Sequence, residues 1–196
     1  MTLSTEVEVE NGRNQIQSDQ PWVTAARQGD VAAWEYLVRQ YQQPTFRLAY
    51  LILKNVEDAE EVAQEVFVRA FQALHTFDEK RPLQPWLMQI TRNLARNRQR
   101  SLGRYWAAIQ RWRQKVPVAE TGVTDSQDAQ LLWQAVQQLK PTAQEIIYLR
   151  YFLEFSEAET AEILQIKKGT AKSRLSRALA QLRQVIDTDF QELKDY

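Results

Sequence analysis

A run of cations without any acidic residue lies near the carboxyl-terminal end of the chain. Neither Asp nor Glu occurs between Glu162 and Asp187, and the six cations of this stretch are Lys167, Lys168, Lys172, Arg174, Arg177 and Arg183. Uncompensated positive charge attracts phosphates, and an Arg side chain can also donate two hydrogen bonds to the edge of a guanine. The chemistry expected here is nucleic-acid binding. Charge alone leaves a solvated basic helix open as the alternative.

Two short helices with a tight turn between them are predicted to carry these cations. Ser156 and Glu159 have the S-x-x-E spacing of a capping box, so a helix is expected to begin at Glu157. The segment Leu164 to Gly169 is the expected turn, and a second helix should start near Lys168. One side of the first helix is expected to hold small or apolar residues, namely Ala158, Ala161 and Leu164.

The second helix has an apolar stripe and an open polar side. The stripe follows helical spacing and consists of Ala171, Leu175, Ala178, Leu179 and Leu182. The open side holds Lys168, Lys172, Ser173, Ser176 and Arg177. Cap, turn, small residues and basic face together favour a DNA-binding helix-turn-helix over a solvated helix.

The other residues capable of chemistry do not form a catalytic or metal-binding pattern. The chain of 196 residues has no Cys, which excludes thiolate metal sites, and its single histidine, His75, is expected to cap carbonyls at a helix end instead of serving a His-based metal site or triad. Glu57, Glu61 and Glu65 lie four residues apart on a predicted helix without a cleft beside them, so we interpret them as solvent charges. No glycine-rich phosphate loop occurs. Neither an enzyme nor a cofactor is expected.

Composition and charge distribution point to a protein with several partners. Hydrophobic residues make up 44% and charged residues 26%, as in ordinary globular proteins, and no apolar run is long enough to cross a membrane. The N-terminus lacks the form of a signal peptide, so a cytoplasmic protein without membrane insertion is expected. The net charge is zero, but Asn55 to Glu65 is acidic and Lys80 to Ala119 contains cations without acids.

Helical periodicity and helix-breaking residues define the first part of the chain. The first predicted helix is opened by Pro21 and Trp22 and ended by Gly29, a second helix is capped by Asp30, and a third is started by Pro44. A long helix is expected from about Glu57 to His75. It is followed by a loop from Thr76 to Pro85 and by a helix from Trp86 to about Arg100. The positions expected inside the long helix are Ala59, Val62, Ala63, Val66, Phe67, Ala70, Phe71 and Leu74.

The second part is predicted to begin after a linker. An amphipathic helix is expected over Asp128 to Leu139, followed by a helix with Pro141 at its first position and an end near Phe152. The expected fold is all-α, with two small helical domains joined by a flexible linker. The predicted boundaries are a disordered tail over 1–20, a first domain over 21–100, the linker over 101–127, a second domain over 128–186 and a C-terminal tail over 187–196.

Both predicted domains resemble parts of one protein family. The segments WEYLVRQYQQPTFRLAYLIL, NVEDAEEVAQEVFVRAFQAL and FDEKRPLQPWLMQITRNLARN resemble region 2 of sigma-70 family transcription initiation factors, and LKPTAQEIIYLRYFLEFSEAETAEILQIKKGTAKSRLSRALAQLR resembles their region 4. A chain with only these two regions is similar to the extracytoplasmic-function subgroup. The resemblance implies a sigma factor that binds the β′ clamp helices and β flap of core RNA polymerase, recognises −35 and −10 promoter DNA, promotes melting and is controlled by an anti-sigma factor.

The resemblance also implies three sets of site residues. The recognition helix would contact the −35 element through Lys168, Thr170, Lys172, Ser173, Arg174, Ser176 and Arg177, with Lys168 and Arg174 on the DNA backbone. The −10 element would be captured and melted by Phe77, Trp86, Arg92, Asn93, Arg96 and Asn97. Core polymerase would meet Asp58, Glu61, Gln64, Glu65 and Arg69. Two alternatives remain open, because Trp86 is also suited to the core and the acidic set also fits a solvated helix face.

The chain departs from the family pattern in its turn and recognition helix. Lys167 and Lys168 stand where relatives often have Pro and an aliphatic residue, and Ser176 is smaller than the residue that many relatives carry there. Two rival functions follow from the helix-turn-helix or the basic charge alone: a regulator that only occupies an operator, and a helical adaptor that binds RNA or acidic proteins. Neither rival has a use for the first domain.

Overall fold

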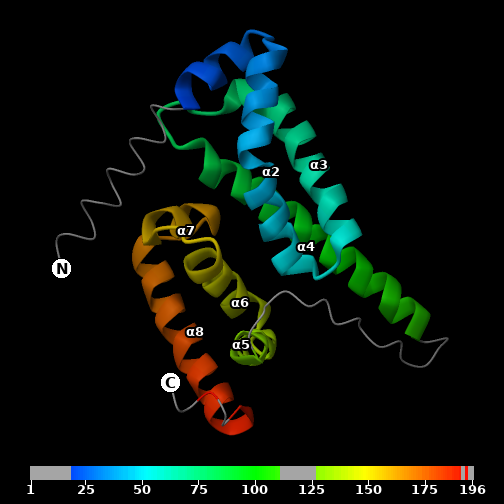
Figure 1. Cartoon of the computed structure of the whole chain (residues 1–196), viewed down its shortest axis with the longest axis vertical. Coiled ribbons are helices and arrows are strands. Elements are labelled where there is room, and N and C mark those ends of the chain that lie inside the picture. Colours follow the sequence, from blue (N-terminus) through cyan, green and yellow to red (C-terminus); the bar gives the residue numbers. More distant parts are fainter. Residues whose placement is uncertain (1–18, 111–126, 191–192, 194–196) are drawn as a thin grey trace. The chain divides into compact units, whose positions relative to one another are not determined.

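The computed structural model describes residues 19–110, 127–190 and 193, and across these ranges the regular structure is helical, with no strand. The described residues form two compact units (Figure 1), the first made mainly of residues up to 103 and the second mainly of the residues after it. The predicted all-α fold with two small helical domains is therefore confirmed. Most of the predicted linker and almost the whole predicted N-terminal tail lie outside the described residues.

The first unit is a bundle of long helices. A helix over residues 19–27 leads into α2 (Val31–Leu53), α3 (Val56–Ala73), a 3-10 turn (Leu74–Thr76) and α4 (Leu83–Gln110). Helices α2 and α3 run side by side in opposite directions (Figure 1) and pack against each other. Buried aliphatic residues from the three long helices fill the space between them, among them Leu37, Leu48, Val66 and Leu87.

Local capping residues define where α2 and α3 begin. The Asp30 carboxylate accepts hydrogen bonds from the Ala32 and Ala33 amides at 2.9 and 3.1 Å, and the Asn55 side chain accepts one from the Asp58 amide at 2.7 Å. Each bond satisfies an amide that has no partner inside the helix. Gly29, with φ of +91°, ends the preceding helix. The predicted boundaries at Gly29 and Asp30 are confirmed, and α3 begins one residue before the expected start at about Glu57.

The prediction that Pro44 starts a separate helix is wrong, because Pro44 lies inside α2. Apolar residues continue across it at helical spacing, and Leu37, Tyr41, Leu48 and Ile52 are all buried. A proline inside a helix costs about 3 kcal/mol, whereas each large apolar side chain contributes about 1.5–3 kcal/mol when it is buried. Burial of the stripe therefore outweighs the cost of the proline.

Helix α4 is longer at both ends than its sequence pattern predicts. It begins at Leu83 instead of Trp86, so that Pro85 lies in the first turn, where a missing amide proton costs no helical hydrogen bond. It also continues to Gln110, past the expected end near Arg100. The Gln99 side chain, which donates to the Ile52 carbonyl at 3.1 Å, ties α4 to the end of α2.

The second unit holds the helices predicted for it, in the predicted order. It consists of α5 (Gln127–Gln137), α6 (Pro141–Ile147) with a π-helical turn (Tyr148–Phe152), α7 (Glu157–Ile163) and α8 (Lys168–Asp189). Pro141 stands at the start of α6, as expected. Helices α5 and α6 both pack on α8, which continues three residues beyond the predicted domain end at 186.

A polar network joins α5 to α6 and so supports α8. The Gln144 side-chain amide donates to the carbonyls of Gln137 and Leu139, both at 2.9 Å, and the Tyr148 hydroxyl donates to Gln144 Oε1 at 3.1 Å. Gln137 Nε2 in turn donates to that hydroxyl at 2.9 Å. Burial raises the pKa of the Tyr148 hydroxyl above its ordinary value, so the group stays a neutral donor at physiological pH.

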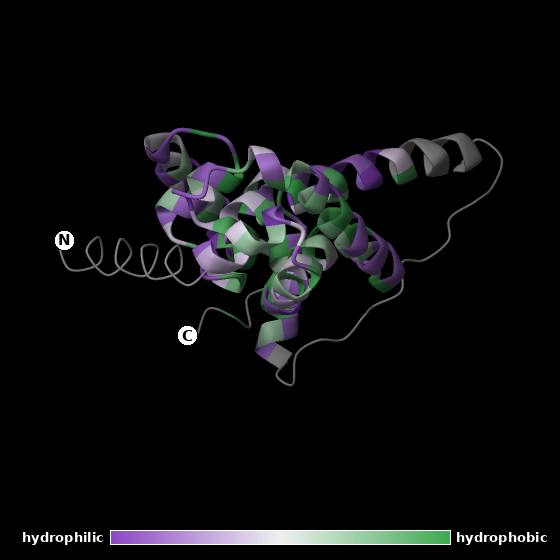
Figure 2. Cartoon of the chain, turned by 90° about the horizontal axis from the view of Figure 1, so that it is seen from above, coloured by the Kyte–Doolittle hydropathy of each residue, from purple (hydrophilic) through white to green (hydrophobic). Residues whose placement is uncertain are grey.

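Most helices in both units are amphipathic. In Figure 2 hydrophobic and hydrophilic residues alternate around the individual helices instead of occupying whole helices. This pattern is typical of helices that bury one face in a core and expose the other. Among the described residues no helix combines the length and the hydropathy that crossing a membrane requires.

Candidate nucleic-acid and protein interfaces

The helix-turn-helix begins with the predicted capping box. The Ser156 amide donates to the Glu159 carboxylate at 2.8 Å, and the Glu159 amide donates to the Ser156 hydroxyl at 3.2 Å. Both predicted bonds of the reciprocal cap are present, and α7 starts at Glu157 as expected. The start of the motif is thus fixed by two residues that are adjacent to it in sequence.

The turn between α7 and α8 is at the predicted place, and α8 starts at Lys168 as expected. Gln165 has φ of +56°, in the left-handed region, and the Ile166 amide donates to the Ala161 carbonyl at 2.9 Å. Gly169 is inside α8 and does not provide the turn. The predicted apolar side of α7 is partly wrong, because Ala158 is exposed whereas Thr160 and Ala161 are buried.

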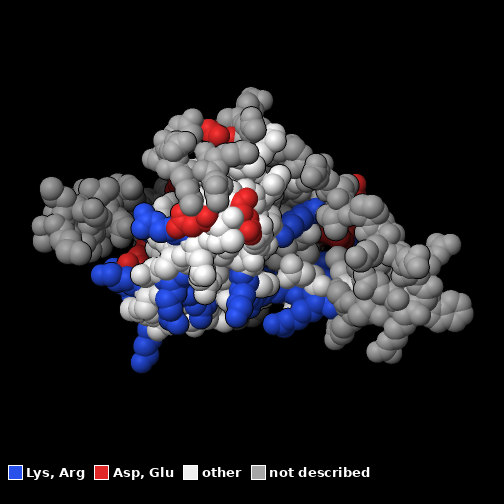
Figure 3. Space-filling model, turned by 90° about the horizontal axis from the view of Figure 1, so that it is seen from below, with Lys and Arg blue, Asp and Glu red and all other residues white. Residues whose placement is uncertain are grey.

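Helix α8 presents the predicted polar side to solvent. Ala171 and Ala178 are buried at 1% and 2% exposure, and these small residues let α8 lie close to its supporting helices. Six of the seven predicted DNA-contacting residues are exposed and Arg174 is half-buried: Lys168, Thr170, Lys172, Ser173, Ser176 and Arg177 form the exposed set. Exposed Lys and Arg side chains of the protein are visible in Figure 3.

Arg177 and Ser173 are connected on the surface of α8. Arg177 Nε donates to the Ser173 carbonyl at 3.1 Å, and its Nη2 lies 3.4 Å from the Ser173 hydroxyl. The Ser173 hydroxyl itself donates to the Thr170 carbonyl at 3.1 Å. These contacts hold the guanidinium along the exposed side of the helix, so less side-chain entropy remains to be lost when it meets a partner.

The residues predicted for the −10 element are divided between core and surface. Phe77 is buried at 6% exposure, and its ring centroid lies 4.9 Å from that of Trp86, which is half-buried. On α4, Asn93 and Asn97 are exposed, and Arg92 and Arg96 are partly exposed. The structure therefore brings four polar residues together on α4, and it places Phe77 where its ring supports Trp86.

The acidic residues of α3 are partly paired within the first unit. Arg98 of α4 contacts Asp58 at 2.6 Å and Glu61 at 2.7 Å, and the hydrogen bond to Asp58 is the main reason why the pKa of Arg98 is raised. Glu65 pairs with Arg69 at 2.6 Å on the same helix. All five residues predicted to contact core polymerase lie on α3, and Asp58 is the only one of them that is not exposed.

Two exposed apolar residues of α3 were not predicted. Val68 is 56% exposed and Phe71 is 52% exposed, although the sequence pattern placed Phe71 inside. Both follow Gln64 at spacings of four and seven residues and share its side of the helix. The Phe71 ring contacts Trp34 of α2 at a centroid distance of 5.3 Å. We call Gln64, Val68 and Phe71 the α3 ridge.

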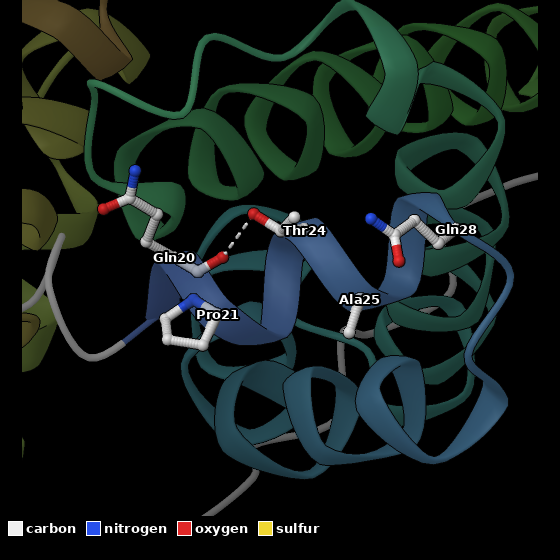
Figure 4. Close-up of a pocket in the computed structure, with 5 residues that line it drawn as sticks. All are labelled: Gln20, Pro21, Thr24, Ala25 and Gln28. Carbon is white, nitrogen blue, oxygen red and sulfur yellow. Dashed lines mark hydrogen bonds between the residues drawn. The ribbon is translucent and has the colours of Figure 1, made fainter.

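Neither the hollows nor the ionisable residues form a catalytic arrangement in the part of the chain that the structure describes. The hollow drawn in Figure 4 is lined by Gln20, Pro21, Thr24, Ala25 and Gln28, none of which titrates near physiological pH. In the same described ranges, no group of His, Asp or Glu is arranged to hold a metal ion. The surfaces with functional potential are therefore α8, α4 and the α3 ridge.

Comparisons with known proteins match both units to one family. The model for Sigma-70 region 2 matches residues 37–105, which cover most of α2, all of α3 and most of α4. The model for Sigma-70 region 4 matches residues 129–182, which cover most of α5, all of α6 and α7 and most of α8. The surfaces described above thus lie within the two matched regions.

Relatives and solved structures agree with this match. The chain is 31% identical over 173 residues to the ECF RNA polymerase sigma factor SigW of Bacillus subtilis, covering 82% of this chain and 92% of SigW. It is 33% identical over 176 residues to the ECF RNA polymerase sigma factor SigE of Mycolicibacterium smegmatis, covering 85% of this chain and 68% of SigE.

Among solved structures, the sigma factor RpoE of Bartonella quintana, crystallised with the anti-sigma factor NepR, has a TM-score of 0.63 and 25% identity, covering 81% of this chain and 99% of that one. CnrH, solved in complex with the cytosolic domain of CnrY, has the same fold with a TM-score of 0.65 and 24% identity, over 87% and 98%. Together with the two region models, these likenesses show that the chain belongs to the extracytoplasmic-function subgroup of sigma-70 family RNA polymerase sigma factors.

Proposed function

We propose that this sigma factor directs core RNA polymerase to promoters through three surfaces: α8 for the −35 element, the Phe77–Asn97 segment for the −10 element, and α3 for the polymerase. The observation that carries the proposal is the presence, in one chain, of a region 4 with an exposed basic helix and a region 2 with an exposed mixed face. The chain acts by binding and not by catalysing a reaction, and it acts in the cytoplasm, where polymerase and DNA meet.

Recognition of the −35 element belongs to the exposed side of α8. Helices of this width enter the major groove, where Arg can make two hydrogen bonds to guanine. Arg177 has the donors for such a contact, whereas Lys172, Ser173 and Ser176 are suited to phosphates or to either role. Lys168 and Arg174 are proposed to touch the DNA backbone, and Thr170 lies beside them at the start of the helix.

Capture of the −10 element belongs to α4 and the loop before it. Unpaired bases need stacking surfaces and hydrogen-bonding groups, and an exposed backbone needs cations. Trp86 offers a partly exposed ring supported by Phe77, and Asn93 and Asn97 offer exposed amides. Arg92 and Arg96 supply the charge. Because Phe77 is buried, we assign it the support of Trp86 and not a base contact.

The polymerase contact belongs to α3, where the ridge of Gln64, Val68 and Phe71 lies beside Glu61, Glu65 and Arg69. Exposed apolar residues next to charges are typical of the centre and rim of a protein interface. Asp58 and Glu61 are suited to a basic partner helix such as the β′ clamp helices, and region 4 is proposed to meet the β flap. Control by an anti-sigma factor is proposed from RpoE, which was crystallised with one.

Run-off transcription tests the function directly. Purified protein is added to core RNA polymerase on a promoter mapped by sequencing transcript starts after overexpression. A transcript that neither component gives alone is expected. If the protein protects duplex DNA without core enzyme and supports no transcript, it is an operator-binding regulator and the proposal fails.

Replacing Phe71 by alanine is expected to weaken core polymerase binding by about 1 kcal/mol, since a half-exposed aromatic residue at an interface centre loses its contact area. Its loss should also lower stability by about 1 kcal/mol, because the residue is 52% exposed but its ring contacts Trp34. The measurement is a titration of labelled protein with core polymerase.

Tyr36 is the matched control for Phe71, because it is an aromatic residue of the same unit with 40% exposure and lies on α2. Tyr36→Ala should leave polymerase affinity within about twofold, a change below 0.5 kcal/mol. Equal losses in the two variants would show that the α3 ridge has no special role.

A further inference from the structure

Arg27 is the residue through which the first helix holds the segment that precedes α4. Its Nε donates to the Leu74 carbonyl at 2.8 Å, its Nη2 donates to the Phe77 carbonyl, and its Nη1 contacts a Glu79 carboxylate oxygen at 2.5 Å. All three acceptors lie within the six residues that follow α3, from Leu74 to Glu79. A single side chain thus holds this segment at three points.

Thr24 adds a fourth contact from the same helix. Its hydroxyl lies 2.9 Å from the Gln20 carbonyl, as drawn in Figure 4, and 3.2 Å from the second Glu79 oxygen. A hydroxyl has one proton, so it donates to one of these acceptors at a time. When the hydroxyl donates to Glu79, both oxygens of the carboxylate are bound, one by Arg27 and one by Thr24.

The two carbonyls that Arg27 binds lie where the helical pattern ends. The 3-10 turn stops at Thr76, so the Phe77 carbonyl lies just past its end, whereas the Leu74 carbonyl at its start also accepts from the Phe77 amide at 3.2 Å. A guanidinium has a planar fork of donors that can serve two carbonyls and a carboxylate together, which the single ammonium of Lys cannot reproduce. Arg27 and Glu79 are three-quarters buried, so solvent screens their contact less than that of a surface pair.

The loop also has contacts that do not involve Arg27. Asp78 organises a local turn, because its carboxylate accepts from the Lys80 amide and its carbonyl accepts from the Arg81 amide, each at 3.0 Å. Phe77 is anchored in the core beside Trp86. The direction in which the loop leaves Phe77 therefore depends on the Arg27 contacts, and so does the ring that supports Trp86.

We propose that Arg27 and Glu79 are positioning residues for promoter opening: they hold the Phe77–Pro82 loop and the Phe77–Trp86 pair in the arrangement that receives an unpaired base of the −10 element. This inference rests on the proposed function of the loop and of α4. Neither residue needs to touch DNA, because their contacts are with the protein itself.

The test uses holoenzyme assembled from core polymerase and full-length protein, with a fork DNA whose −10 strand is unpaired, taken from the mapped promoter. Arg27→Gln is expected to weaken fork binding about tenfold, the scale of a lost charge-assisted hydrogen bond. Arg27→Lys should weaken fork binding less than Arg27→Gln does. Core affinity and binding of a fully paired −35 duplex should stay within about twofold, a difference that ordinary surface changes produce.

Two further variants complete the design. Arg39→Gln removes an exposed Arg of α2 that pairs at the surface with Glu35 within the described part of the chain, and it should behave as wild type in every assay. Glu79→Gln keeps the shape of the side chain and should weaken fork binding in the same direction as Arg27→Gln. It keeps the proposal testable if Arg27→Gln does not fold.

The outcomes separate the inference from the proposed function. Wild-type holoenzyme that does not bind the fork overturns the function of the loop and the inference with it. If the wild-type holoenzyme binds the fork and folded Arg27→Gln or Glu79→Gln binds it equally well, the inference is overturned and the proposed function of the loop stands. Equal losses of fork binding and core affinity would mean a general structural role and would also overturn it.

Discussion

Arg177→Ala is expected to weaken promoter binding by about 1–3 kcal/mol and to relax the base preference at one position of the −35 element. The reason is that a bidentate contact to guanine supplies both affinity and discrimination, and alanine supplies neither. Arg177 is exposed on α8, and its contacts with Ser173 keep it on the exposed side that we propose to meet DNA. The measurement is holoenzyme binding to the mapped promoter and to a set of single-base −35 variants.

Two other substitutions separate base reading from charge. Arg177→Lys keeps the charge but not the fork of donors, so it should still lose discrimination. Arg183→Ala removes an exposed cation of the same helix, six residues further on, and should lower affinity equally for all sequences while reducing the salt dependence. Unchanged base preference in Arg177→Ala would remove Arg177 from the set of base-reading residues.

Ile146→Ala is expected to lower the stability of the second unit by about 2–5 kcal/mol, the usual cost of removing a buried aliphatic side chain and leaving a cavity. Ile146 is 1% exposed on α6, which packs on α8. Because α8 has few buried residues of its own, it depends on α6 for its position. Denaturant unfolding followed by circular dichroism should show the second unit melting earlier.

The functional readout of Ile146→Ala distinguishes the two units. Binding of −35 DNA should fall together with stability, whereas the affinity of the first unit for core polymerase should be retained. Thr142→Ala, at an exposed position of the same helix, should change stability by no more than about 0.5 kcal/mol. A full-length protein in which both units lose stability to the same extent would contradict the independence of the units.

Helix boundaries set by local contacts were predictable from the sequence. Asp30, Asn55 and Ser156 each bind amides two or three residues away, so their types and spacing determine where α2, α3 and α7 begin. The apolar stripe of α8 was predictable for the same reason, since it follows a period within one helix. The helix start predicted at Pro44 is wrong because the free-energy cost of a proline in a helix is local and visible in the sequence. The burial that outweighs this cost comes from α3 and other distant parts of the chain.

Faces that depend on distant neighbours were not predictable. Ala158 and Phe71 fit an apolar pattern, but their partner helices leave them exposed. Phe77 is an aromatic residue of the kind that stacks on bases, which is why the sequence suggested a base contact. Its burial follows from its contact with Trp86 and from the position of the loop, which Arg27 holds although it is about fifty residues away in sequence. Arg27 itself gave no signal in the sequence, because every one of its acceptors is remote along the chain.

The Arg98 pairs with Asp58 and Glu61 change how the acidic side of α3 can meet a basic partner. A lysine or arginine from outside meets carboxylates that already bind a guanidinium through one oxygen each, so it has to share them with Arg98 or displace it. If the proposed docking displaces Arg98, it is an exchange of one cation for another, in which the electrostatic gain is only a difference between two similar contacts. Such an exchange selects a partner by the geometry of its cations, and added salt weakens it less than it weakens an attraction between unpaired charges.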